Sequence, residues 1–595
     1  MPSLPARVIL ALKLTLGLFI LILAAGNSLQ PISDPDVFWH LRTGAWIWEH
    51  KTLPEKFLFT FTAPATLNVM QHFTMTSYWV FQLVMALFFA AGGWKGIFVL
   101  RFLLSALFVW ALALRRKGDD LILLGLLALA VMVMQIYSFE RPQASSFIFF
   151  ALLLEQLDWL RRSPAGADRV PLRRVIALPL LMVAWANCHG GYVIGQGVIA
   201  LYLAVEAVKH LHPSLGPLCW KRYRLLLMIG TAGLLASLVN PNTYHGFEVA
   251  LLPSWSTASV REYLPTIALF RESGAIAIIA YWFLLGLAVL GTFLSATRLD
   301  LTRIALLALT GYFSFTQSRY VAFLAVTALP IVQEALSRER FRTIGRILVL
   351  APAVLVGLTL LKQDWGYLKD RPALFGVNFP LFPTDAADFL ETAKIQGQMY
   401  NYFGWGGYLS WRLAPAEVFI DGRNSDHDLF DKYKAFDSGT ARVLVDGRPY
   451  WKSMFKSFGI RYTVTPFFDH YTGTALPLLL DYLAADPDWV AVFIGLNSVV
   501  YVENTTENRA VIERFSIPRR EVLPALLDRC EWLIRESPGD PRFHIAKGDV
   551  LIYLSRFSEA KASLERASAL APASPQLRTR LDWLQRRGTN ERPAR

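Results

Sequence analysis

Long apolar runs recur through the first 361 residues, and no other feature of the chain restricts its fold as strongly. Hydrophobic residues make up 54% of the sequence, and a helix needs about 20 mostly apolar residues to cross a bilayer. The runs predict a polytopic α-helical membrane protein with about eleven spans. The predicted spans are 8–26, 96–114, 119–137, 144–160, 174–188, 190–208, 223–240, 275–296, 301–317, 319–337 and 343–361.

Lys and Arg are divided unequally between the two sets of predicted loops. Positive side chains mark the cytoplasmic side of a membrane protein, and the short loops of the poorer set contain only Arg141, Arg261, Arg271 and Arg319. We therefore expect a cytoplasmic N-terminus, extracytoplasmic residues 362–595 and a multi-pass protein of the plasma (bacterial inner) membrane. The net charge of +13 then reflects topology, and no nucleic-acid partner is predicted.

The apolar run Tyr78–Gly92 is the segment whose placement these charges decide. Counting it as a span would put Arg115–Lys117 on the external side, against the positive-inside rule. We expect instead a helix that lies on the external membrane surface or re-enters it. It would belong to a long first external loop, residues 27–95. The alternative is a twelfth span.

The transmembrane domain, residues 1–361, ends where the hydropathy falls. Residues 362–517 mix helical and strand patterns, which predicts an extracytoplasmic α/β domain. Its expected strands are 417–421 and 460–465, with a hairpin of 489–494 and 498–503, and its expected helices are 384–394, 447–457 and 475–485.

Residues 518–595 follow a helical pattern throughout. Asp540-Pro541 recurs as Ser574-Pro575 after 34 residues, which is the length of a tetratricopeptide repeat. This spacing predicts a tetratricopeptide-like helical tail, and a generic helical hairpin is the alternative. Because such repeats present binding surfaces, we expect the tail to bind a protein partner and not to carry catalysis.

Two carboxylates stand just after the first predicted span, in the segment Ser33–His40. Asp34 precedes a proline, which favours an extended backbone, so the two side chains are not expected to share one task. Asp36 precedes a helical run and suits its N-cap. Asp34 has no such local structural role, so it is the stronger catalytic candidate, and Asp36 is the second. His40 and Arg42 would project from the first two helical turns, where a histidine is more often structural.

The order of the motifs resembles the GT-C superfamily of integral-membrane glycosyltransferases. The stretch from Asp34-Pro35-Asp36 to His40 is similar to the first-loop motif of oligosaccharyltransferases, in which an aspartate before a proline carries the essential carboxylate. The run Tyr78–Gly92 resembles the juxtamembrane helix of protein mannosyltransferases and lipid A aminoarabinose transferases. Three external turns, 138–143, 187–192 and 317–320, resemble the charged turns of these enzymes. His189 departs from their lysine, and the first loop lacks a directly adjacent acidic pair.

The resemblance implies transfer of a sugar, with inversion, from a polyprenyl-phosphate-linked donor to an extracytoplasmic glycan or protein acceptor. Asp34 would act as the base or orient the acceptor. Arg141, His189 and Arg319 would bind the donor phosphate, because guanidinium forks match phosphate oxygens. Oligosaccharyltransferases use a divalent cation. The external acids of this chain are dispersed, so no cofactor is expected to be obligatory, although a divalent cation fits the resemblance.

Further residues are candidates for substrate contact, each beside a structural alternative. Glu140 could bind a cation or pair with Arg141, and the pair is the favoured expectation. The loop 241–273, which contains Tyr244, His245 and Glu262, could cover bound donor. Tyr408 belongs to an aromatic–Gly–Tyr stretch similar to one in oligosaccharyltransferase soluble domains. Asp421 and Arg423 follow the strand expected at 417–421, where they would either touch substrate or form a turn with a salt bridge.

Two other classes of function remain open. One is a transporter or flippase of a lipid-linked saccharide, although the membrane half shows no convincing internal repeat of the kind that transporters often have. The other is a non-catalytic membrane scaffold that recruits partners through its helical tail.

Overall fold

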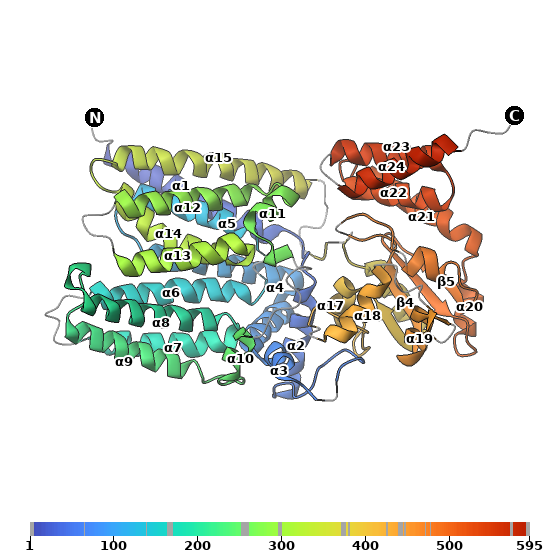
Figure 1. Ribbon diagram of the computed structural model, residues 1–595, viewed down its shortest axis with the longest axis horizontal. Coiled ribbons are helices and arrows are strands. Elements are labelled where there is room, and N and C mark those ends of the chain that lie inside the picture. The colour runs from blue at the N-terminus through green and yellow to red at the C-terminus, as the bar shows by residue number, and fades with distance from the viewer. Residues whose placement is uncertain are drawn as a thin grey trace. The chain divides into compact units, whose positions relative to one another are not determined.

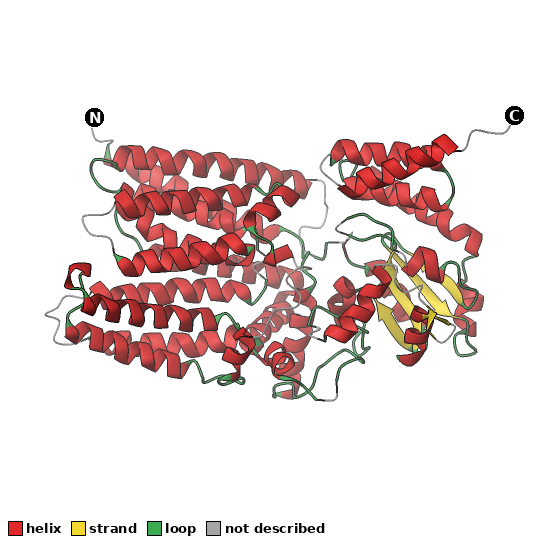
Figure 2. Cartoon of the chain, viewed as in Figure 1, coloured by secondary structure: helices red, strands yellow, loops and turns green. Residues whose placement is uncertain are grey.

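The chain forms two units, each with its own set of internal contacts (Figures 1 and 2). The computed structural model describes residues 5–64, 66–137, 140–162, 170–251, 261–294, 300–369, 376–378, 381–423, 426–437, 444–445, 448–470, 472–476, 478–571 and 575–590. The first unit comprises Met1–Lys56 and Leu67–Gly376, and the second comprises Phe57–Thr66 and Val377–Arg595. A short piece of the predicted first external loop therefore belongs to the second unit.

The first unit is a bundle of long helices that lie side by side (Figure 1). Its helices are α1 (Ala6–Leu29), α2 (Asp36–His50), α3 (Val69–Thr76), α4 (Trp79–Leu114), α5 (Asp120–Met134), α6 (Gln143–Arg162), α7 (Leu172–Cys188), α8 (Tyr192–Leu211), α9 (Trp220–Ala236), α10 (His245–Leu251), α11 (Thr266–Ser273), α12 (Ile276–Leu294), α13 (Leu301–Thr316), α14 (Val321–Leu336) and α15 (Arg342–Lys369), with 3-10 turns η1 (Pro213–Leu215), η2 (Arg261–Tyr263) and η3 (Ser318–Tyr320).

Each predicted span coincides with one of these helices. Among the described residues, six helical segments are long and apolar enough to cross a membrane, and two shorter apolar helices, α5 and α13, accompany them. The protein is therefore a polytopic helical membrane protein with a small additional sheet, while the count of about eleven spans stays a prediction.

Helix α4 contains a sharp break at Gly93, where φ is +56° and ψ is −137°. Glycine tolerates this left-handed φ because it has no Cβ. The chain turns so tightly that a Cβ on Gly96 would lie 1.9 Å from the carbonyl oxygen of Phe88. The helix expected at 78–92 thus ends where the helical backbone is interrupted, at Gly93. It packs closely on α2, since a Cβ on Gly44 would lie 2.0 Å from the carbonyl oxygen of Gln82.

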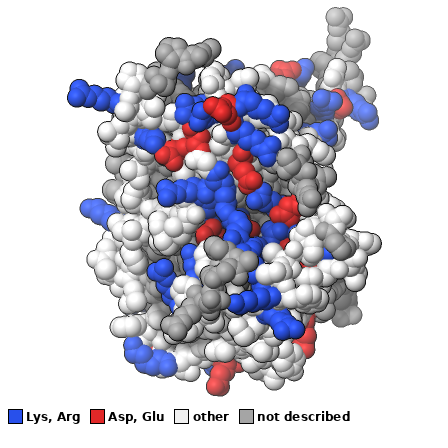
Figure 3. All heavy atoms as spheres, turned by 90° about the vertical axis from the view of Figure 1, so that its left-hand side faces the viewer, with Lys and Arg blue, Asp and Glu red and all other residues white. Residues whose placement is uncertain are grey.

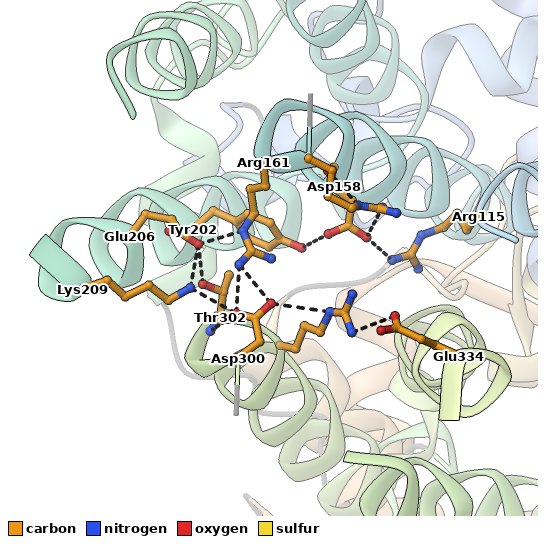
Figure 4. Close-up of polar contacts among 11 residues, drawn as sticks. Arg115, Asp158, Arg161, Tyr202, Glu206, Lys209, Asp300, Thr302 and Glu334 are labelled. Carbon is orange, nitrogen blue, oxygen red and sulfur yellow. Dashed lines mark hydrogen bonds and ion pairs between the residues drawn. The ribbon is translucent and has the colours of Figure 1, made fainter. Parts of the chain in front are cut away.

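At the other end of the bundle, ion pairs join α6, α8 and the start of α13 (Figure 4). Arg161 lies 2.7 Å from Glu206 and 2.8 Å from Asp300, and Lys209 lies 2.9 Å and 3.0 Å from the same two carboxylates. Thr302 donates a 2.7 Å hydrogen bond to Glu206, whose side chain is fully buried. Lys and Arg side chains gather on the surface of this end (Figure 3).

The second unit contains a four-stranded sheet in the order β1-β4-β6-β5. β1 is parallel to β4, and β6 is antiparallel to both β4 and β5. The strands are β1 (Gln398–Asn401), β4 (Ile460–Pro466), β5 (Trp489–Ile494) and β6 (Ser498–Glu503), and β2 (Leu444–Val445) pairs separately with β3 (Arg448–Pro449). The helices beside them are α16 (Thr384–Ala393), α17 (Gly406–Arg412), α18 (His427–Asp437), α19 (Tyr450–Ser457) and α20 (Arg509–Phe515), with a 3-10 turn η5 (Phe403–Trp405) and a π-helix η7 (Leu478–Leu483).

The predicted hairpin is confirmed, because β5 and β6 begin and end where the sequence placed them. The strand expected at 417–421 is wrong. Val418 forms only an isolated bridge, with Thr60, and β1 takes the sheet position beside β4. The reason is a competing partner: Val418 donates to the carbonyl of Phe59, and Phe61 donates to the carbonyl of Val418. The returning loop segment Phe57–Thr66 thus satisfies this backbone.

Four helices close the second unit: α21 (Arg519–Glu536), α22 (Pro541–Tyr553), α23 (Phe557–Leu570) and α24 (Pro575–Asn590). Asp540 caps α22 through the backbone amide of Arg542. Gly548 allows α22 to approach α23, since a Cβ there would lie 2.7 Å from Leu564. The tail is helical as expected, and its membership of the tetratricopeptide class stays a prediction.

The buried ion pairs of the bundle predict a large loss of stability when one partner is removed. Glu206→Gln leaves Arg161 and Lys209 without their buried carboxylate, which typically costs about 3–5 kcal/mol. Thermal unfolding of the detergent-purified protein should therefore shift clearly downwards. Lys13→Gln is the matched control, because it breaks the exposed pair with Asp120, and exposed pairs contribute about 0–1 kcal/mol. Equal shifts in the two variants would contradict this interpretation.

Candidate active site

The two carboxylates of the first loop converge on one guanidinium, contrary to the expectation that they act separately. Pro35 has a helical conformation, with φ −66° and ψ −23°, so the chain turns between Asp34 and Asp36 where an extended backbone was expected. Asp34 accepts a 3.0 Å hydrogen bond from the amide of Asp36. The N-cap assignment for Asp36 is also wrong: helix α2 begins at Asp36 itself, and its N-cap position, Pro35, supplies no side-chain bond.

Arg141, in the turn between α5 and α6, is the group on which these carboxylates meet. Its Nη2 lies 2.9 Å from Asp34 Oδ1 and 2.8 Å from Asp36 Oδ2, and its Nε donates to Asp34 Oδ2. Its Nη1 donates to Glu262 Oε2 at 3.1 Å. Although burial lowers the pKa of Arg141, the charges of Asp34, Asp36 and Glu262 raise it well above its usual value. Arg141 therefore carries a permanent positive charge.

Asp36 titrates closer to neutral pH than an ordinary aspartate. Burial, together with the negative charge of Asp34, raises its pKa to about 6, against the lowering effect of Arg141. Trp39 Nε1 donates a 3.0 Å hydrogen bond to Asp36 Oδ1, which fixes the carboxylate. A carboxylate with this pKa is suited to accept a proton near neutral pH.

Arg319, in η3, is the second cation of the site, and Glu262 links it to Arg141. Its Nη1 lies 3.7 Å from Glu262 Oε1, and its guanidinium carbon lies 4.6 Å from the ring centroid of Tyr263. Ser318 donates to the carbonyl of Glu262 at 3.1 Å, which ties η3 to η2. Among the described residues, the buried Nε of Arg319 has no hydrogen-bond partner. Arg319 therefore retains donor capacity, whereas every guanidinium nitrogen of Arg141 is directed at a carboxylate.

His189 is a neutral hydrogen-bond donor in this site. The amide of Gly191 donates to its Nδ1 at 3.0 Å, so Nδ1 is an acceptor. Trp185 donates to Ser146 Oγ at 2.7 Å, and Ser146 lies 2.7 Å from the same Nδ1. Burial, then Arg319 and Arg141, lower the pKa of His189 to about 3. The imidazole therefore keeps its proton on Nε2 and supplies an N–H group in place of a lysine's positive charge.

Tyr78 is a site residue that the sequence analysis assigned only to the interfacial helix. Its ring lies 5.6 Å from that of His189 and 5.5 Å from that of His40. The sequence could have identified Tyr78 as a site residue, because it lies at the start of α4, in the same external loop as the two carboxylates.

Two candidates for substrate contact in the first unit, Glu140 and His40, instead make buried contacts with other side chains of the bundle. Glu140 was expected to pair with Arg141, but it is fully buried and forms a two-pronged pair with Arg101 at 2.6 and 2.7 Å. The backbone turn that directs Arg141 towards the first loop directs its neighbour into the bundle. His40 is 3% exposed and contacts Gln82 through Nδ1 at 3.1 Å, in agreement with its structural alternative.

The remaining first-unit candidates are Arg42, Tyr244 and His245. Arg42 is half-buried on α2. Tyr244 precedes α10 and is 57% exposed, and His245 pairs with Glu248 at 2.9 Å on the same short helix. Of the proposed covering loop 241–273, residues 252–260 lie outside the described part of the chain.

The second-unit candidates are buried. Asp421 and Arg423 form an ion pair with no exposed side-chain surface, and Arg423 donates a 2.7 Å hydrogen bond to the carbonyl of Leu58. The pair therefore has the structural role that the sequence analysis gave as the alternative to substrate contact. Through Leu58 it also binds the segment Phe57–Thr66. Tyr408 is 3% exposed and packs against Phe382.

No family model matches the chain, and no curated protein matches it. Two solved structures of the Archaeoglobus fulgidus oligosaccharyltransferase do. The complex with Zn and sulfate is 10% identical, with a TM-score of 0.50, over 93% of this chain and 86% of that chain. The apo form is 11% identical, with a TM-score of 0.49, over 82% and 74%. The chain has the same fold as this oligosaccharyltransferase. At this identity the likeness shows the fold alone.

The pKa of Asp36 can be measured directly. The carboxyl band in infrared difference spectra between wild type and Asp36→Asn should titrate near pH 6, protonated below and ionised above. Arg141→Ala should move this titration to higher pH, because the charge of Arg141 favours the ionised form. A titration near the ordinary aspartate value, unmoved by Arg141→Ala, would contradict the described environment.

Proposed function

We propose that the protein is an integral-membrane glycosyltransferase that moves a sugar from a polyprenyl-phosphate-linked donor to an extracytoplasmic acceptor. The observation that carries the proposal is the meeting of Asp34 and Asp36 with Arg141, beside Arg319, in a GT-C fold. Both functions that the transfer needs are then present. A carboxylate can take the proton of the acceptor hydroxyl, and cations can stabilise the departing phosphate.

The two carboxylates have different roles in the proposed reaction. Asp36 is held in place by the hydrogen bond from Trp39, and burial raises its pKa, so we assign it as the group that accepts the acceptor proton. Asp34 is held by two nitrogens of Arg141 and by the amide of Asp36, so it positions the reacting segment. The acceptor oxygen attacks the anomeric carbon as the phosphate leaves, which inverts that centre. The phosphate needs no second acid, because it is already a competent leaving group.

The donor phosphate is bound chiefly by Arg319 and His189. Arg319 has an unpartnered Nε, and His189 offers Nε2–H from a neutral ring. Arg141 contributes its charge, since its nitrogens already face carboxylates. Donors fixed in a water-poor site act on developing charge more strongly than they would in water.

Lipid binding tests the phosphate assignment. In nanodiscs that contain undecaprenyl phosphate, native mass spectrometry should show bound lipid on the wild type and roughly 10–100-fold weaker binding for Arg319→Ala, since a hydrogen bond to a charged group contributes about 1.5–3 kcal/mol. Arg271→Ala is the control, because Arg271 is an exposed arginine of α11 outside the site. Equal loss in both variants would reveal nonspecific attraction, and no loss in either would overturn the assignment.

Turnover separates an enzyme from the other two classes. Asp36→Asn should keep lipid binding and lose about 10²–10⁴-fold in transfer, the usual contribution of a general base. Asp34→Asn should also keep lipid binding and lose transfer, because the segment that carries Asp36 is no longer held by Arg141. The readout is mass spectrometry of envelope glycans and glycoproteins from cells that lack the gene, complemented with each variant. A flippase would still translocate lipid-linked saccharide, and a scaffold would be indifferent to both changes. A glycan profile that does not change when the gene is removed would refute the proposal.

A further inference from the structure

Three carboxylates from two distant parts of the chain surround one guanidinium at the candidate site. Asp34 and Asp36 come from the first loop, and Glu262 comes from η2, more than 220 residues later in the sequence. Arg141 lies among them and comes from a third part of the chain, between α5 and α6. Converging carboxylates of this kind are the ligands that Mg²⁺, Mn²⁺ and Ca²⁺ prefer. Here the cation that they hold is a side chain.

The geometry around Arg141 fits a guanidinium and not a metal ion. Its nitrogens form an ion pair with Asp36 at 2.8 Å and charge-assisted hydrogen bonds to Asp34 at 2.9 Å and Glu262 at 3.1 Å. A divalent cation needs oxygen ligands at about 2.0–2.6 Å, so the carboxylates would have to move inwards and Arg141 would have to leave. Among the described residues, no three His, Cys, Asp or Glu side chains are arranged to hold a metal ion.

We infer that Arg141 takes the place of a divalent cation in this site: it is a built-in counter-ion that gathers Asp34, Asp36 and Glu262. A guanidinium suits this task because it is planar, always charged and rich in N–H donors. The inference deepens the proposed function. It depends on that function only where turnover is concerned, since the arrangement of the cation and its carboxylates can be tested without any substrate.

The substitution has a chemical consequence. A metal ion can offer an open coordination position to a phosphate oxygen and can be removed by a chelator. The nitrogens of Arg141 are committed to carboxylates, so the phosphate is held by other donors, and chelators have nothing to remove. Removing the guanidinium alone would leave three neighbouring carboxylates whose mutual repulsion a divalent cation relieves.

Manganese binding to wild-type and variant protein tests the inference directly. Each protein is washed with chelator in detergent and titrated with Mn²⁺, while electron paramagnetic resonance follows the signal of the free ion. The wild type should show no saturable Mn²⁺ site. Arg141→Ala should take up about one equivalent, at least about tenfold more tightly than the wild type. Arg141→Ala combined with Glu262→Gln should lose this gain, because one of the three carboxylates is gone.

Arg319→Ala is the matched control, since it removes the other cation of the site but leaves Arg141 among its carboxylates. It should bind Mn²⁺ no better than the wild type. A saturable Mn²⁺ site in the wild type that Asp34→Asn abolishes would overturn the inference. So would an Arg141→Ala protein that is folded by circular dichroism and binds no more Mn²⁺ than the wild type.

Two further results keep the test decisive if Arg141→Ala does not fold. The wild-type titration alone distinguishes a guanidinium-filled site from a metal site. Sugar transfer by the wild type should also persist, within about twofold, after exhaustive chelation, and a loss of transfer restored by Mn²⁺ would refute the inference. If the protein transfers no sugar at all, the proposed function fails while the Mn²⁺ titrations still decide the role of Arg141.

Discussion

The cluster of charges around Arg141 is the interaction on which the candidate site depends. Carboxylates that leave water lose favourable hydration, and a partner must compensate for this loss. Arg141 provides that compensation for Asp34 and Asp36, and its bond to Glu262 adds a segment from much later in the chain. Glu262 in turn faces Arg319. One guanidinium therefore joins turns that lie far apart in the sequence, and it helps to fix the positions of Asp34 and Asp36.

Much of the membrane unit could be predicted because apolar length and positive charge obey simple rules. Each expected span lies on a helix, and the charge argument separated Tyr78–Gly92 from the following span at the place where Gly93 breaks α4. The selection of Asp34, Arg141 and Arg319 rested on their order along the chain and on a family resemblance, and the structure brings them into one cluster. Their roles in catalysis stay proposals.

The errors arose where tertiary contacts overrode local preference. The rule for a residue before proline places Asp34 in an extended backbone, but it says nothing of Pro35, whose helical turn brings both carboxylates to one side. Glu140 pairs with Arg101 from another helix, a contact that no local pattern reveals. The strand expected at 417–421 lost its place in the sheet to contacts with the distant segment Phe57–Thr66.

The path of that segment affects how the molecule can be divided. Residues 57–66 belong to the second unit, where Leu58 and Phe59 accept hydrogen bonds from Arg423 and Val418. From Leu67 the chain continues with the rest of the first unit. The chain therefore passes between the two units three times, after Lys56, after Thr66 and after Gly376. A fragment that starts at Val377 would lack the strip that contacts Val418 and Arg423. Neither unit is one continuous stretch of the sequence, so cutting the chain at Gly376 alone does not separate them.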